Sequence, residues 1–182
     1  MPTESQPIEL NIPAPKFNLP GVDGKMHSLE SYQAAKILVV GFTCNHCPYV
    51  QAYEARLIEL CDQFQNRGVA FVCINSNDDV AYPDDSFANM EKRAKLLKFN
   101  FDYLRDESQR VAKDFNAACT PEFYVYDQQR MLRYHGRLDD NHKDPISVKH
   151  AYLRDAIDQL LISKNPATAQ TAAIGCGIKW KK

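Results

Sequence analysis

The chain of 182 residues is long enough for one domain with a substantial hydrophobic core. Its 22 basic and 23 acidic residues give a net charge of −1, which argues against nucleic-acid binding. The first residues lack the basic and apolar regions of a signal peptide, and no apolar run reaches membrane-spanning length. We therefore expect a cytoplasmic protein that acts without a membrane or nucleic-acid partner.

The N-terminal part of the chain predicts an extended arm followed by a β-hairpin. Residues 1–16 hold four prolines and little periodicity, so we expect an arm that ends near residue 12. Residues 17–19 and 25–27 flank a turn-rich stretch and are typical of two hairpin strands. Ser28 is expected to cap a short helical turn over 29–35.

The middle of the chain alternates apolar strands with amphipathic helices. Residues 37–42 are apolar throughout, which predicts a central strand covered on both faces. A helix with one buried stripe follows and ends at Gly68, and residues 69–74 predict a second apolar strand. The stripe consists of Val50, Tyr53, Leu57, Leu60 and Phe64.

The second half predicts shorter elements. They are a polar loop over 75–85, a helix over 87–97, a short strand near 102–104, a short helix near 108–115, a hairpin over 123–126 and 131–136, and a helix that begins at Pro145 and ends before Asn165. This order predicts an α/β domain over residues 13–163, with a central mixed sheet flanked by helices. Residues 164–182 are expected to form a C-terminal tail.

The segment Cys44-Asn45-His46-Cys47 places two thiols where the strand over 37–42 turns into a helix. Unpaired backbone N–H groups and the positive end of the helix dipole lower the pKa of a cysteine in a first turn. Two intervening residues also allow the sulfurs to form and reopen a disulfide. This spacing predicts a redox-active pair. Of the two residues between the cysteines, the His46 imidazole is expected to stabilise the thiolate and Asn45 to donate a weaker hydrogen bond to it.

Several segments together resemble a known family. They are residues 15–25, the strand over 37–42, the pair Cys44 and Cys47 followed by Pro48, and Thr120-Pro121 before a strand. Together they resemble the redoxin branch of the thioredoxin superfamily, which covers alkyl hydroperoxide reductase and thiol-specific antioxidant relatives and thioredoxin-like thiol-disulfide oxidoreductases. The resemblance implies a thioredoxin-like fold over residues 13–163 and no bound cofactor. It also implies a cis Pro121 beside Cys44, with the backbone of Thr120 free to pair with an extended substrate.

The sequence departs from this family's motifs in two places. The peroxidase motif Pro-x-x-x-Thr/Ser-x-x-Cys fits neither cysteine, because Cys44 or Gly41 stands where the motif has its hydroxyl residue. The buried carboxylate that thioredoxin carries before its first cysteine is replaced by Leu38. Proton transfer must then come from elsewhere, with Glu122 or water as candidates.

We therefore expect a thiol-disulfide oxidoreductase in which Cys44 attacks a substrate disulfide and Cys47 resolves the mixed disulfide. His46 is expected to lower the pKa of Cys44. Its partners would be disulfide-containing proteins or small thiols, together with an unidentified electron donor. Two alternatives stay open. One is a thiol peroxidase that uses Cys44 or Cys47 with Cys119 or Cys176 as resolver, and the other is a module that binds zinc through Cys44, Cys47, Cys119 and His46.

The other cysteines differ in their expected roles. Cys61 and Cys73 are expected in the core. Cys119, which the resemblance places near Cys44, is a third redox thiol or a regulatory one. Cys176 either folds back as a resolving thiol or is inert in a flexible tail, and we favour the inert role.

The remaining candidate ligands are expected at the surface. Asp78-Asp79 and Asp84-Asp85 lack the calcium-loop pattern and predict a solvated loop. The four histidines outside the cysteine segment show no metal-ligand spacing. They are His27, His135, His142 and His150.

Overall fold

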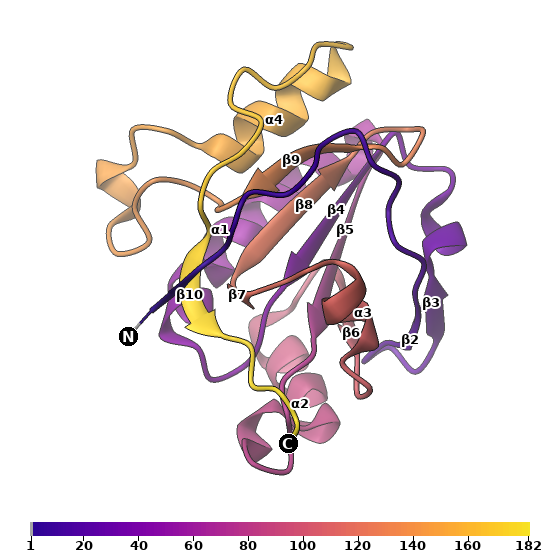
Figure 1. The fold of residues 1–182 in the computed structure, drawn as a ribbon, viewed down its shortest axis with the longest axis vertical. Helices are drawn as coiled ribbons and strands as arrows, with labels where there is room; N and C mark the ends of the chain where they lie inside the picture. The colour runs from indigo at the N-terminus through magenta and orange to yellow at the C-terminus, as the bar shows by residue number, and fades with distance from the viewer. Residues whose placement is uncertain (1) are drawn as a thin grey trace.

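A five-stranded mixed sheet forms the centre of the structure, a computed structural model that describes residues 2–182 (Figure 1). Its strand order is β6-β5-β4-β8-β9, with parallel pairing from β4 to β5 to β6 and antiparallel pairing from β4 to β8 to β9. The strands are β4 (Ile37–Phe42), β5 (Val69–Asn75), β6 (Asp102–Arg105), β8 (Glu122–Tyr126) and β9 (Leu132–Gly136). The predicted mixed sheet, with its late antiparallel hairpin, is confirmed.

Side chains of β4 alternate between two hydrophobic clusters, one on each face of the sheet. Ile37 and Val39 belong to the cluster that includes residues of α1, α2 and α4, whereas Leu38, Val40 and Phe42 belong to the cluster that includes residues of α3 and of the N-terminal strand β2 (Asn18–Pro20). Every residue of β4 is buried, which explains the uninterrupted apolar run. The helices are α1 (Pro48–Phe64), α2 (Phe87–Leu97), α3 (Arg110–Asp114) and α4 (Tyr152–Leu161).

Helix α1 follows the predicted pattern. All five residues of the predicted stripe are buried, and Cys61 is buried on the same helix. The 3-10 turn Gln65–Arg67 ends at Gly68, whose φ of 85° lies in the left-handed region that glycine adopts without strain. The end of this helix is therefore encoded locally.

The last helix begins later than the sequence predicts. Pro145–Ser147 forms a separate 3-10 turn in which the side chain of Asp144 accepts a hydrogen bond from the Ile146 N–H. The backbone is then extended at Val148, with ψ of 124°, so α4 begins only at Tyr152. The proline starts a local turn that the chain does not extend, and the predicted start at Pro145 is wrong.

Both ends of the chain return to the body of the protein. β1 (Thr3–Glu4) pairs antiparallel with β10 (Ile174–Gly177), and β10 pairs antiparallel with β7 (Cys119–Thr120). Figure 1 shows β10, in yellow, between the N-terminal segment and β7. The N-terminal hairpin consists of β2 (Asn18–Pro20) and β3 (Met26–Ser28), close to the predicted strands.

The remaining short elements are 3-10 turns. Leu29–Tyr32 begins after Ser28, which forms a capping box with Ser31, and Pro83–Asp85 precedes α2. Within residues 2–182, no helix combines the length and apolar character that crossing a bilayer requires.

Candidate active site

Cys44 and Cys47 lie in the loop between β4 and α1. Cys47 is the N-cap residue of α1 and Pro48 occupies the first helical position, as the sequence suggests. Both side chains are buried, with exposed fractions of 1% for Cys44 and 0% for Cys47. The pair thus stands at the amino end of a long helix, shielded from bulk water.

Thr120 connects the two thiols from the opposite side of the site. Its hydroxyl Oγ1 lies 3.3 Å from Cys44 Sγ, and its carbonyl oxygen lies 3.2 Å from Cys47 Sγ. The peptide bond from Thr120 to Pro121 is cis, as the resemblance implied, and Pro121 and Cys44 line the same crevice. The structure therefore brings together four residues that the sequence singles out: Cys44, Cys47, Thr120 and Pro121.

The two thiols differ in how well their surroundings stabilise a negative charge. A hydrogen bond from Cys44 lowers the pKa of Cys47 to about 4, with further hydrogen bonds from the Cys176 side chain and from the backbone N–H groups of Val50 and Cys176. When Cys47 is protonated, its S–H can donate to the Thr120 carbonyl instead. Burial opposes this lowering, and the hydrogen bonds outweigh it, so the surroundings favour the thiolate form of Cys47 over that of Cys44.

Cys44 holds the proton of the pair. Its hydrogen bond with Cys47, its burial and the nearby Asp85 carboxylate all raise the pKa of Cys44, and only the Thr120 hydroxyl opposes them. The prediction of a lowered Cys44 pKa is therefore wrong. The helix terminus does not offset the hydrogen bond with Cys47, the burial of Cys44 and the nearby Asp85.

That carboxylate, Asp85, is the main site residue that the sequence missed. It has no exposed surface, and its two oxygens accept hydrogen bonds from four groups: Asn45 N (2.6 Å), His46 Nδ1 (2.5 Å), Asn75 Nδ2 (3.3 Å) and Asn77 Nδ2 (2.7 Å). The expectation that Asp85 belongs to a solvated loop is wrong. A buried carboxylate needs such a set of donors, and they come from two separate segments, residues 45–46 and 75–77.

His46 and Asn45 both face Asp85. The His46 ring also stacks on Tyr82, with ring centroids 5.4 Å apart. The Asn45 side chain donates to the Asp84 carbonyl at 2.7 Å and accepts from the Tyr103 hydroxyl at 2.9 Å. Their contacts hold the loop before α1 against the 3-10 turn Pro83–Asp85.

Cys44, His46 and Asp85 also meet the distance requirement for a metal site. One ligand atom from each lies within 4.8 Å of the others. The zinc set expected from the sequence is not the set that meets here, because the trio contains neither Cys47 nor Cys119 and includes Asp85 instead. The four hydrogen bonds to Asp85 account for its burial without an ion.

Cys119 lies in a separate buried network around Glu122. Glu122 is fully buried and accepts from the N–H groups of Ala118 (2.8 Å) and Cys119 (3.1 Å), the Tyr124 hydroxyl (2.8 Å) and His135 Nε2 (2.7 Å). His135 is 1% exposed, so the prediction of a surface histidine is wrong. Burial and Glu122 raise the pKa of Cys119, which makes it a poor nucleophile.

The other predicted histidines and core cysteines are placed as follows. His27 is partly buried, and its ring nitrogens lie 3.0 Å from Asp23 Oδ1 and 3.5 Å from Asp102 Oδ2. The potential metal-ligand atoms of these three residues all lie within 4.8 Å of one another. His150 is exposed and His142 is half-buried. Cys61 and Cys73 are both in the core, as predicted.

The C-terminal segment places Cys176 against the pair. In the antiparallel pairing of β10 with β7, Cys176 lies directly opposite Thr120, so the Thr120 backbone is not free as the resemblance implied. The Cys176 thiol hydrogen-bonds with Cys47 and packs on the cluster of Cys44, Cys47 and Val50. Burial and this contact raise the pKa of Cys176 to about 11.

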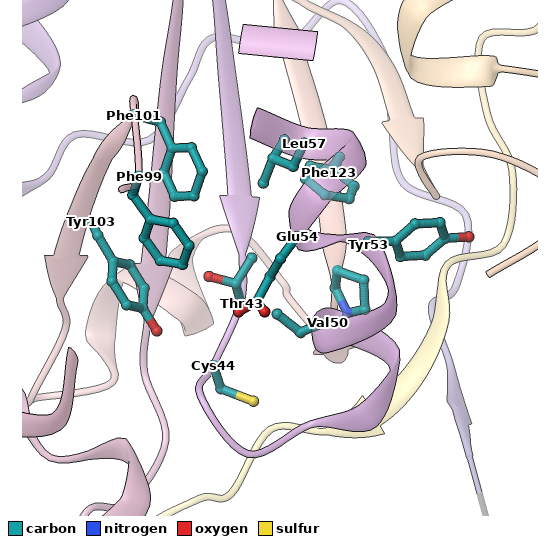
Figure 2. Close-up of a pocket in the computed structure, with 11 residues that line it drawn as sticks. Thr43, Cys44, Val50, Tyr53, Glu54, Leu57, Phe99, Phe101, Tyr103 and Phe123 are labelled. Carbon is teal, nitrogen blue, oxygen red and sulfur yellow. The ribbon is translucent and has the colours of Figure 1, made fainter. Parts of the chain in front are cut away.

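Cys44 also borders a narrow apolar crevice (Figure 2). Figure 2 shows Phe99, Phe101 and Tyr103 on one side and Val50 and Leu57 of α1 on the other. Its volume of about 10 Å³ suits one water molecule at most. A substrate larger than water enters this crevice only if the side chains that line it move.

The chain matches the model of the AhpC/TSA family over residues 10–135. No curated protein matches it significantly. An uncharacterized conserved protein from Geobacillus kaustophilus is 42% identical, with a TM-score of 0.95, covering 100% of this chain and 97% of that one. A hypothetical protein from Sinorhizobium meliloti is 38% identical, with a TM-score of 0.93 and 98% coverage of both chains.

A more distant solved structure has a described activity. A secreted disulfide oxidoreductase from Mycobacterium tuberculosis is 19% identical, with a TM-score of 0.58, covering 81% of this chain and 95% of that one. That level of identity shows the fold alone, and the fold is thioredoxin-like. The family match and the strong similarity to two full-length structures lead to one assignment. The chain belongs to the AhpC/TSA family and has a thioredoxin-like fold.

Proposed function

We propose that this protein is a thiol-disulfide oxidoreductase that cycles between a Cys44, Cys47 dithiol and a Cys44–Cys47 disulfide. The observation that carries the proposal is the packed pair of thiols at the start of α1, with both sulfurs in contact with Thr120 of the cis peptide. A substrate disulfide takes up two electrons and two protons and becomes two thiols, while the pair becomes a disulfide. The pair stores both electrons, so the reaction requires no bound cofactor.

The pKa difference supports a division of roles within the pair. The Cys47 thiolate begins the exchange and forms a mixed disulfide, because thiolates are the nucleophiles of this reaction. Cys44 then attacks Cys47 Sγ and releases the substrate thiol. This order reverses the roles expected from the sequence, where Cys44 attacks first.

Cys44 must lose its proton in the second step. The Asp85 and His46 ligand atoms lie within 4.8 Å of Cys44 Sγ, a span that one water molecule can bridge. We assign proton transfer to this pair, in place of the carboxylate that Leu38 replaces. Glu122, the candidate from the sequence, is instead fully engaged in the network around Cys119.

The proposal is tested by the rate at which the protein catalyses reduction of insulin disulfides by dithiothreitol. Cys44→Ser and Cys47→Ser are expected to reduce that rate to the uncatalysed level. Cys61→Ala is the matched control, because Cys61 is a buried cysteine of α1 that belongs to the core cluster rather than to the site. Serine variants that keep the wild-type rate would refute the proposal.

Two further measurements separate the alternatives. Peroxide consumption far above that of free cysteine, lost in Cys47→Ser, would identify a thiol peroxidase instead. One equivalent of tightly held zinc in protein purified under reducing conditions, lost in Asp85→Asn, would identify a metal-binding module at Cys44, His46 and Asp85.

A further inference from the structure

Strand β10 is built to lie close to the cis peptide of Thr120 and Pro121. Cys176 is opposite Thr120 and Gly177 is opposite Cys119. A Cβ atom on Gly175 would lie 1.9 Å from the Thr120 carbonyl oxygen, so only glycine permits this approach. The sequence Gly175-Cys176-Gly177 therefore fixes a thiol at the position where the resemblance places a substrate backbone.

Hydrogen bonds hold β10 on both sides of Cys176. The backbone of Ala173 exchanges hydrogen bonds with Ser5, at 2.9 Å each, and the Ile178 N–H donates to the Ala118 carbonyl at 3.2 Å. Lys179 continues the attachment, with its N–H donating to Asn77 Oδ1 at 2.9 Å. The segment around Cys176 is thus fixed in place and does not behave as the flexible tail that the sequence predicts.

Cys176 also differs from the other cysteines in its exposure. Cys44, Cys47, Cys61, Cys73 and Cys119 are buried, whereas Cys176 is partly exposed. The Cys176 side chain packs against the buried cluster that contains Cys44 and Cys47, so a partly exposed thiol lies next to the buried pair. An external thiol can therefore meet Cys176 before it meets the buried pair.

We propose that Cys176 is the third thiol of the exchange and carries the disulfide between the buried pair and external thiols. This inference rests on the proposed function, because it requires a Cys44–Cys47 disulfide to act on. It assigns Cys176 to the half of the cycle in which the protein is reduced, with external thiols as the compounds that meet Cys176 first.

The exchange runs in three balanced steps during reduction of the protein. The Cys176 thiolate attacks Cys47 Sγ, the Cys44–Cys47 bond breaks, a Cys47–Cys176 bond forms and Cys44 takes up a proton. An external thiolate then attacks Cys176 Sγ, forms a mixed disulfide and releases Cys47 as a thiolate. A second external thiolate attacks the mixed disulfide, leaving Cys176 as a thiol and an external disulfide as the product.

The contacts around Cys47 favour the second step. The thiol with the lower pKa is the better leaving group in disulfide exchange, and Cys47 has the lowered pKa. Attack on the exposed sulfur therefore expels the buried one. In the first step Cys47 is part of a disulfide and carries no charge, so its contribution to the raised pKa of Cys176 is absent.

The first test removes Cys44 and asks whether Cys47 pairs with Cys176. Cys44→Ser is equilibrated in glutathione redox buffers, quenched with acid, alkylated and analysed by peptide mapping. We expect a Cys47–Cys176 disulfide as the main oxidised species. Separate glutathione adducts on Cys47 and Cys176, without a bond between them, would overturn the inference. Gly175→Ala in the same background is expected to lower the yield of this disulfide, because its Cβ forces β10 away from Thr120.

The second test measures the rate at which glutathione reduces the oxidised wild-type protein. Cys176→Ser is expected to slow this reduction at least about tenfold, and the Cys61→Ala control to leave it unchanged. If the Cys44–Cys47 disulfide forms and Cys176→Ser reduces at the wild-type rate, the relay is refuted and the proposed function stands. If the wild type forms no Cys44–Cys47 disulfide, the proposed function itself has failed.

Discussion

The buried carboxylate of Asp85 accepts a hydrogen bond from His46, with Oδ2 2.5 Å from Nδ1, directly beside the thiol of Cys44. The two residues lie 39 positions apart in the sequence and meet because β4, β5 and the loop after β5 converge at one end of the sheet. This contact places a carboxylate and an imidazole near Cys44, in a chain that has Leu38 where thioredoxin carries its buried carboxylate.

Asp85→Asn is expected to slow the release of substrate from the mixed disulfide on Cys47. Without this proton acceptor near Cys44, the rate of that step is expected to fall about 100-fold. The Asp85→Asn variant should also lose about 2 kcal/mol in the free energy of unfolding, because the NH2 group of asparagine would face N–H donors that a carboxylate oxygen now accepts. The measurements are single-turnover quenching and denaturant unfolding. Asp84→Asn, an exposed neighbour, is the control and should match the wild type in both.

The pH dependence of the reduced pair follows from the pKa of Cys47. Because that pKa is lowered to about 4, the thiolate is present from about pH 5 upward, whereas a free cysteine acquires it only near pH 8.5. The thiolate absorbance in the ultraviolet should therefore appear on the acid side and remain constant through neutral pH. Cys47→Ser should lose this transition. An absorbance that rises only above pH 8 would contradict the assignment.

Thr120→Val tests the hydroxyl that contacts Cys44 Sγ at 3.3 Å. Reduction of the disulfide pair releases Cys44 with a developing negative charge, which this hydroxyl can stabilise. Its removal should slow reduction by glutathione roughly tenfold, the equivalent of one hydrogen bond. Thr120→Ser keeps the hydroxyl and should restore most of the rate, whereas a rate unaffected by valine would assign Thr120 a packing role only.

Glu122→Gln is expected to destabilise the fold without affecting the redox pair directly. Glu122 Oε2 accepts from two backbone N–H groups and Oε1 accepts from Tyr124 and His135, so a glutamine NH2 group in place of Oε1 can no longer accept the Tyr124 hydroxyl hydrogen. We expect a loss of roughly 2–3 kcal/mol in the free energy of unfolding. Glu107→Gln, at an exposed position, is the matched control. Equal stability of the two variants would contradict the role of this network.

Local patterns were sufficient to predict the centre of the fold. Three features have the predicted structure, and each is encoded by residues that are close together in the sequence. They are the apolar run over 37–42, the stripe from Val50 to Phe64 and the helix end at Gly68. The pair at Cys44 and Cys47 was located by the same reasoning, because its spacing and its position before a helix are local features.

The errors concern contacts between distant segments. Asp85 looks like a loop residue because its four donors come from Asn45, His46, Asn75 and Asn77, which no local pattern connects to it. β10 has four residues, two of them glycines, and its partner Thr120 lies far earlier in the chain. A short glycine-rich strand carries almost no signal of its own, so the placement of Cys176 required the structure.

The most direct test of the account is peptide mapping of the wild-type protein across a graded glutathione redox series. We predict that a Cys44–Cys47 disulfide is the stable oxidised form and that it appears and disappears reversibly in a single two-electron transition. A series in which no cysteines pair, or in which the first stable bond joins Cys119 to Cys44 or Cys47, would contradict the account.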